Sequence, residues 1–204
     1  MGFYSDRVLP RIIRRTCGLP MMTPLRRRAC GPLYGDVVEV GFGSGLNVGL
    51  YPAAVTSVTA VEPNDTAWRL GRELVSSSAV PIDRSGLDGS DLPFADDAFD
   101  CALSTFTLCT IPDLPRALGE LRRVVRPGGT LAFLEHGRAP DAAVRRSQRR
   151  FEPFQRRFAG GCHLTRDVST LIEEAGWEIV DLDRFYAEGT PRPFGAIHLG
   201  AARN

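Results

Sequence analysis

The sequence contains no lysine, no long apolar run and no closely paired cysteines, and each absence narrows what the protein can be. All 25 basic residues are arginine, which we attribute to the codon usage of a GC-rich genome rather than to a demand for guanidinium groups. No segment approaches the roughly 18 apolar residues that a membrane-spanning helix needs. The first residues also lack the apolar stretch and cleavage site of a secretory signal, so we expect a cytoplasmic protein.

The five cysteines are scattered along the chain and form no CxxC pair. Their number and spacing match neither a disulfide framework nor a set of metal ligands. We therefore expect reduced thiols, and the sequence predicts no metal site. Cys109 and Cys162 are interpreted as small buried hydrophobic residues rather than as nucleophiles.

The net charge of +1 conceals two arginine-rich stretches, at residues 1–30 and 138–157. Each contains apolar residues at helical spacing, which predicts amphipathic helices over 5–16 and 142–158, the second kinked or restarted at Pro153. The arginines then lie on solvated helix faces, and the overall charge is not that of a nucleic-acid-binding domain. We expect no nucleic-acid partner, while contact with an anionic membrane surface stays an alternative.

Apolar runs rich in Val, Ile, Leu and Phe alternate with segments of helix length. The runs predict buried strands at 36–40, 55–62, 98–103, 130–135, 179–185 and 196–201. Helices are predicted over 66–77 and 113–124, the second capped by Asp113, and a third helix reaches Ala175 with Thr165 as its cap. This alternation predicts one α/β domain with a doubly wound, mostly parallel sheet and helices on both faces.

A glycine-rich turn follows the first predicted strand. In EVGFGSG, residues 39–45, the three alternating glycines permit the positive φ angles and the close ligand approach that a sharp strand-to-helix turn requires. The spacing differs from the GxGxxG of a dinucleotide site, which disfavours a nicotinamide-dependent oxidoreductase. Glu62 ends the second strand, where a carboxylate can accept the hydroxyl protons of a ribose.

Four successive motifs resemble those of class I S-adenosylmethionine-dependent methyltransferases, nearest the ubiquinone and menaquinone branch. They are EVGFGSG, AVEPN at 60–64, LPFADDAFD at 92–100 and RRVVRPGGTLAFLEH at 122–136. The resemblance implies a Rossmann-like sheet of seven strands and S-adenosylmethionine as the cofactor. We expect one domain over residues 1–204. Its parts would be an N-terminal helical cap at 1–34, a cofactor-binding core at 35–137, a lid or substrate segment at 138–176 and C-terminal strands at 177–204.

The same resemblance implies cofactor-binding roles for residues at the carboxyl ends of the strands. They are Glu39, Gly41, Gly43, Gly45, Asn47, Glu62, Pro63, Asp88, Gly89, Ser104 and Thr105. The glycines would lie near the methionine part of the cofactor, and Glu62 would hold its ribose with Pro63 beside the adenine. Asp88 would bind the adenine amino group and Gly89 would supply a backbone N–H, although this chain has LDGS where GDAE is common.

The remaining motifs resemble a group of small actinobacterial methyltransferases and the thiol S-methyltransferases of animal membranes. They are GSGLNVGLYP at 43–52, STFTLCTIPD at 104–113, FLEHGRAP at 133–140 and GGCHLTRD at 160–167. This resemblance implies methyl transfer to a small lipophilic acceptor, with a thiol first. A quinone, a phenol or a lipid head group stays open as the acceptor, as does a protein that binds S-adenosylmethionine without catalysis. A monomer and a homodimer are both compatible with the sequence.

Two of the three histidines are predicted to be catalytic. His136 ends the fifth predicted strand, at the edge where open α/β sheets keep their sites, so it is a candidate base or orienting group. His163 and Arg166 lie in a glycine-rich loop that could reach over the cofactor, with Arg166 as a substrate contact. Tyr4 is a second candidate substrate contact. His198, in the last predicted strand, is interpreted as structural.

Overall fold

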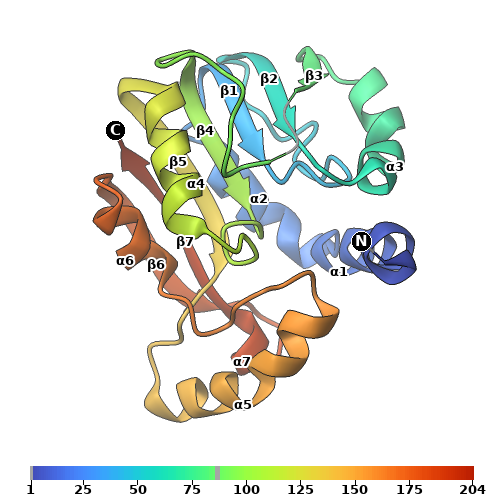
Figure 1. Cartoon of the computed structure of the whole chain (residues 1–204), viewed down its shortest axis with the longest axis vertical. Coiled ribbons are helices and arrows are strands. Elements are labelled where there is room, and N and C mark those ends of the chain that lie inside the picture. The colour runs from blue at the N-terminus through green and yellow to red at the C-terminus, as the bar shows by residue number, and fades with distance from the viewer. Residues whose placement is uncertain (1, 86–87) are drawn as a thin grey trace.

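Seven strands form one sheet in the computed structural model, which describes residues 2–85 and 88–204 (Figure 1). The order is β3-β2-β1-β4-β5-β7-β6. The strands are β1 (Gly35–Val40), β2 (Val55–Val61), β3 (Ile82–Arg84), β4 (Phe99–Thr105), β5 (Val125–His136), β6 (Glu178–Tyr186) and β7 (Ala196–Arg203). Strands β1 to β5 pair in parallel, and β7 runs antiparallel between β5 and β6. The predicted seven-stranded, mostly parallel sheet is confirmed.

Helices connect the strands and cover both faces of the sheet. They are the π-helical turn η1 (Tyr4–Val8), α1 (Leu9–Cys17), the 3-10 turn η2 (Pro20–Met22), α2 (Thr23–Cys30), α3 (Asp65–Ser76), α4 (Leu114–Val124), α5 (Ala142–Phe158), α6 (Val168–Glu174) and α7 (Arg192–Gly195). Figure 1 shows α4 in front of the sheet, and α5 beside α7 below it. No helix within the described residues combines the length and the apolar character needed to cross a membrane.

The side chains of β1 illustrate how both faces of the sheet are buried. Val38 points into a core that contains Leu121 of α4 and Ile172 of α6. Val37 points into the opposite core, which α2 closes with Cys30. Successive residues of a strand face opposite sides, so a strand covered on both sides needs a continuous apolar run.

The strand predictions are confirmed except for one omission. Each of the six predicted strands overlaps an observed one. Strand β3, which pairs in parallel with β2, was not predicted, because its three residues are too few to show a periodic pattern. Leu87, the first residue of the LDGS motif, lies outside the described residues.

Two predicted helix caps have different outcomes. Asp113 caps α4, and its Oδ1 accepts a hydrogen bond of 3.2 Å from the backbone N–H of Arg116. The prediction that Thr165 caps the next helix is wrong. Asp167 directly precedes α6, at the N-cap position, and its side chain accepts a hydrogen bond from the backbone N–H of Thr170, as an N-cap side chain does.

Both predicted amphipathic helices are present, and α5 has the predicted bounds. The N-terminal helix begins with η1 before it continues as α1. Helix α5 runs through Pro153 as one helix, so of the two predicted alternatives, a kink or a restart, the restart does not occur. Aromatic contacts on both sides of the proline stabilise the continuous helix, between Phe151 and Phe194 and between Phe154 and Phe158.

Candidate active site

A cavity of about 360 Å³ lies at the carboxyl ends of β1, β2 and β4. Gly41 and Gly43 follow β1, Glu62 follows β2, and Phe106 follows β4, and all four residues line it. The strand order reverses between β1 and β4, because the chain continues from β1 to β2 on one side and returns to β4 on the other. Open α/β sheets bind ligands at such a switch point.

The glycine turn and Glu62 hold one another in place. Gly41, Gly43 and Gly45 have φ angles of 73°, 61° and 72°, in the left-handed region that glycine adopts at little cost. The carboxylate of Glu62 accepts 2.7 Å hydrogen bonds from the N–H groups of Gly43 and Asn64. A carboxylate has about four acceptor positions, so two remain for a ligand.

A buried polar network lies beneath the glycine turn. Glu39 is 1% exposed and accepts from Asn47 at 2.9 Å and from the hydroxyl of Tyr51 at 2.6 Å. Arg26 of α2 donates at 2.9 Å to the side-chain oxygens of both Asn47 and Thr105. The network ties α2 to the ends of β1 and β4, and so fixes the cavity from below.

Burial raises the pKa of Glu39 to about 7, although hydrogen bonds from Tyr51 and Asn47 and the charge of Arg26 oppose the shift. The charge of a nearby carboxylate, Glu62, raises the pKa of Glu39 further. Since the folded pKa lies above the unfolded value of 4.5, the contribution of Glu39 to stability is complete below pH 4.5 and is lost as the pH rises to about 7.

We expect Glu39→Gln to remove this pH dependence. The side chain of Gln does not titrate. The unfolding free energy of the variant minus that of the parent should therefore be about 2 to 3 kcal/mol larger at pH 8 than at pH 5. Urea unfolding of both ligand-free proteins at the two pH values measures this double difference, in which titrating groups that do not interact with Glu39 cancel. A difference that does not change with pH would contradict the shifted pKa.

The predicted cofactor residues divide into two layers. Those that line the cavity are Gly41, Gly43, Glu62, Pro63, Asp88, Gly89 and Thr105. Four others support this layer: Gly45 belongs to the glycine turn, Glu39 and Asn47 belong to the buried network, and Ser104 is buried and donates a 2.8 Å hydrogen bond to Glu135. Asp88 is exposed at the rim, where its Oδ1 accepts from the N–H of Ser90.

The N-terminal helix closes the cavity with an apolar surface. Leu9, Pro10 and Ile13 of α1 line it opposite the glycine turn, together with Ile111. Segment 138–176 contributes Gly160 to the lining. The cavity is therefore polar along the strand ends and apolar beneath the helix.

Sequence reasoning missed Phe106 and Arg26. Phe106 has a φ of 57°, a strained angle for a residue other than glycine, and such strain often marks a functional site. Its ring lies 4.9 Å from the ring of His136, and the Arg26 guanidinium lies 5.4 Å from it on the cavity wall. A positive φ at phenylalanine has no signal in the sequence, and Arg26 resembled the solvated arginines around it.

The two predicted catalytic histidines lie in different places. His136 lies behind Phe106, and its Nδ1 faces the sulfur atoms of Cys109 and Cys162 at 3.9 and 3.6 Å. Burial alone would lower the pKa of His136, but the contact with Cys162 outweighs burial and raises it. His163 lines a second hollow, on α5, where its Nδ1 is 3.4 Å from Glu152.

The pKa of His163 is lowered, by burial and then by the charges of Arg166 and Arg156, so this side chain is neutral near pH 7. Arg166 does not point freely into the cavity, because its Nη1 donates to the carbonyl oxygens of Leu108 and Ile111 at 2.7 and 2.8 Å. It positions the loop after β4. The hydroxyl of Tyr4 donates at 2.7 Å to the carbonyl oxygen of Phe158, which joins η1 to the end of α5.

Glu135 is a further residue that sequence reasoning missed. It is fully buried, and it accepts hydrogen bonds from Ser104 and from the N–H groups of Thr107, Leu108 and Cys109, at 2.8 to 3.1 Å. These bonds fix the loop that forms one cavity wall. A carboxylate within the otherwise apolar run 130–135 was the available signal.

Comparisons with known proteins agree with this geometry. Residues 38–133 match the family described as methyltransferase domain. The thiol S-methyltransferase TMT1B of Rattus norvegicus is 32% identical over 168 residues, which cover 80% of this chain and 66% of that protein. A phosphatidylethanolamine N-methyltransferase of Cereibacter sphaeroides is 32% identical over 123 residues, which cover 58% of this chain and 60% of that protein. The chain thus spans less than two thirds of the length of these curated relatives.

A solved structure shares the fold over nearly the whole chain. It is an S-adenosylmethionine-dependent methyltransferase of Thermotoga maritima, with a TM-score of 0.67, 20% identity and coverage of 95% of this chain and 93% of that one. The shared fold is a seven-stranded, mostly parallel sheet, and in this chain the glycine turn lies at its switch point. The chain belongs to the class I S-adenosylmethionine-dependent methyltransferases, and within this class it is similar to the thiol S-methyltransferases.

Proposed function

We propose that the protein transfers a methyl group from S-adenosylmethionine to a small lipophilic acceptor, with a thiol as the first candidate. The observation that carries this proposal is the cavity at the switch point, which is polar at Glu62 and apolar beneath Leu9 and Ile13. When bound, the cofactor supplies an electrophilic methyl group on a positively charged sulfur. The protein then has mainly to hold the acceptor close to this methyl group and aligned with it.

The residues of the cavity fit the cofactor. Glu62 retains two acceptor positions that suit the hydroxyl groups of a ribose. Above Gly43 the space is open, since an added Cβ would meet nothing closer than the Gly41 carbonyl oxygen at 3.8 Å. We propose that Asp88 and Gly89, at the rim, contact the adenine and that Thr105 lies near the sulfonium.

Two observations favour a thiol as the acceptor. The first is the similarity to the rat thiol S-methyltransferase over most of this chain. The second is Arg26, a buried cation in the cavity wall, whose Nη2 donates no hydrogen bond to any described residue. A thiol must ionise before it attacks, and a nearby positive charge favours the thiolate.

An assay with methyl-labelled S-adenosylmethionine tests the proposal. We expect the label to pass to one or more alkyl or aryl thiols, and not to matched alcohols that present the same apolar group. Quinols, phenols and phosphatidylethanolamine belong in the same panel, because the C. sphaeroides relative acts on a lipid and the motifs resemble quinone methyltransferases. If the label passes only to one of these other compounds, that compound class replaces the thiol as the proposed acceptor. Cofactor binding without transfer to any acceptor would favour a non-catalytic binding protein.

A further inference from the structure

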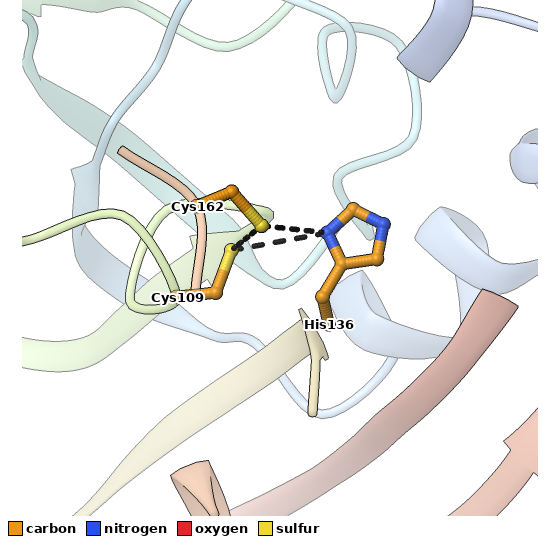
Figure 2. A group of neighbouring side chains, drawn as sticks. All are labelled: Cys109, His136 and Cys162. Atoms are coloured by element: carbon orange, nitrogen blue, oxygen red, sulfur yellow. Dashed lines mark hydrogen bonds between the residues drawn. The ribbon is translucent and has the colours of Figure 1, made fainter. Parts of the chain in front are cut away.

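Three side chains of types that can bind a metal ion converge behind the cavity wall. Figure 2 shows Cys109, His136 and Cys162 with both sulfur atoms and the Nδ1 of the histidine facing one another. The two sulfur atoms are 3.6 Å apart, and they lie 3.9 and 3.6 Å from Nδ1. Cys109 and Cys162 are 0% and 3% exposed. Segments far apart in the sequence, after β4, at the end of β5 and after α5, thus bring three donors to one point.

Hydrogen bonds fix the position of Cys109. Its N–H donates to the carboxylate of Glu135, which is anchored in β5 directly before His136. The carbonyl oxygen of Cys109 accepts a 2.9 Å hydrogen bond from the N–H of His163, the residue that follows Cys162. The two cysteine segments are therefore linked through their backbones.

A glycine pair allows Cys162 to reach the other two residues. Gly160 and Gly161 have φ angles of 64° and 86°, and they turn the chain back after α5. A Cβ on Gly161 would lie 3.3 Å from the carbonyl oxygen of Thr110, which follows Cys109. The backbone of this turn thus packs closely against the loop that carries Cys109.

The three separations match those around a tetrahedral zinc ion. Zn–S bonds of about 2.3 Å and Zn–N bonds of about 2.0 Å place neighbouring ligand atoms about 3.5 to 3.8 Å apart. The observed separations are 3.6, 3.6 and 3.9 Å. A disulfide would account for only two of the three donors and needs the sulfur atoms about 2.05 Å apart.

We propose that Cys109, His136 and Cys162 bind a zinc ion. Thiolate and imidazole ligands in tetrahedral geometry select zinc, and two thiolates neutralise its charge. The thiol protons would pass to water on binding. Within the described residues no fourth histidine, cysteine or carboxylate joins the group. Three protein ligands with one open position are typical of catalytic rather than structural zinc sites.

The open position would take an exogenous thiol. The site lies directly behind the cavity, because Phe106 of the wall packs on His136, and Gly160 and Thr110, which line the cavity, neighbour the two cysteines. A thiol bound to zinc is deprotonated, its proton passing to water, so the ion would present the acceptor as a thiolate. This role rests on the proposed function, whereas metal binding by the three residues does not.

Titration of the reduced, metal-free protein with Co²⁺ tests the site, because tetrahedral cobalt with thiolate ligands absorbs strongly. We expect one Co²⁺ per chain, displacement of it by Zn²⁺, and a further increase in the thiolate-to-cobalt band when an alkyl thiol is added. Cys109→Ser, Cys162→Ser and His136→Ala should each weaken Co²⁺ binding at least about 100-fold. Cys101→Ser, which changes another buried cysteine, should bind as the parent does.

Each variant is first compared with the parent by circular dichroism and by binding of S-adenosylmethionine, so that loss of metal is separated from loss of fold. No stoichiometric Co²⁺ binding, or equal binding by the parent and the three variants, would overturn the site. Metal binding with no spectral response to thiols would overturn the role of the open position. Because the readout is spectroscopic, failure to find a methyl acceptor would leave these results unchanged.

Discussion

Glu62→Gln should lower the affinity for S-adenosylmethionine at least about 100-fold, which corresponds to about 2.7 kcal/mol. The carboxylate of Glu62 already accepts from the N–H groups of Gly43 and Asn64. The amide of glutamine has one acceptor oxygen, so it cannot hold both backbone groups and a ribose. Hydrogen bonds to a charged group contribute about 1.5 to 3 kcal/mol each, so losing one or two accounts for the expected change.

Asp65→Asn provides the matched control. Asp65 begins α3 on the same edge of the sheet, and its carboxylate is 78% exposed in an ion pair with Arg84. Its substitution removes the same charge but no acceptor in the cavity, so cofactor affinity should stay within about threefold of the parent. Calorimetric titration of the three proteins gives the comparison. Equal affinities for the parent and Glu62→Gln would show that Glu62 does not hold the ribose.

Gly41→Ala should mainly lower stability, whereas Gly43→Ala should mainly weaken cofactor binding. An added Cβ at Gly41 would overlap the side chain of Thr107, whose own Cβ would be only 2.6 Å away, so rotation of that side chain cannot relieve the clash. The N–H of Thr107 is held by Glu135. We expect Gly41→Ala to lower the unfolding free energy by about 3 kcal/mol, from overpacking and backbone strain together.

At Gly43 the added methyl group meets open space. The substitution should therefore lower the unfolding free energy only by the strain of a left-handed backbone at a residue other than glycine, about 1 to 2 kcal/mol. That open space belongs to the cavity, so the substitution should weaken cofactor binding while the protein stays folded. Urea unfolding and calorimetry on both variants separate the two effects. If Gly43→Ala binds the cofactor as the parent does, the cofactor does not pass over this glycine.

The sheet could be predicted because its signals are local in the sequence. The long strands are rich in apolar residues, and Asp113 is a recognisable helix cap directly before a periodic segment. Strand β3 was not predicted because its three residues show no periodic pattern. The cap of α6 was misplaced because Thr165 and Asp167 are both good capping residues, and only the path of the chain selects between them.

The candidate site could be predicted only for residues that belong to a recognisable sequence motif. Glycine spacing and Glu62 located the cavity, because both belong to adjacent strand ends. Arg26 could not be separated from its arginine neighbours, since its burial depends on how α2 packs under the sheet. The meeting of Cys109 with Cys162 also had no sequence signal, because the two residues are 53 positions apart and the turn after α5 brings them together.

Calorimetric titration of the parent protein with S-adenosylmethionine, and separately with NADH, tests the central claim most directly. The claim is that the glycine turn and Glu62 form an S-adenosylmethionine site at the switch point of the sheet. It predicts one S-adenosylmethionine bound per chain and no binding of NADH at the same concentrations. Binding of NADH without binding of S-adenosylmethionine would contradict it, and would assign the cavity to a nicotinamide cofactor instead.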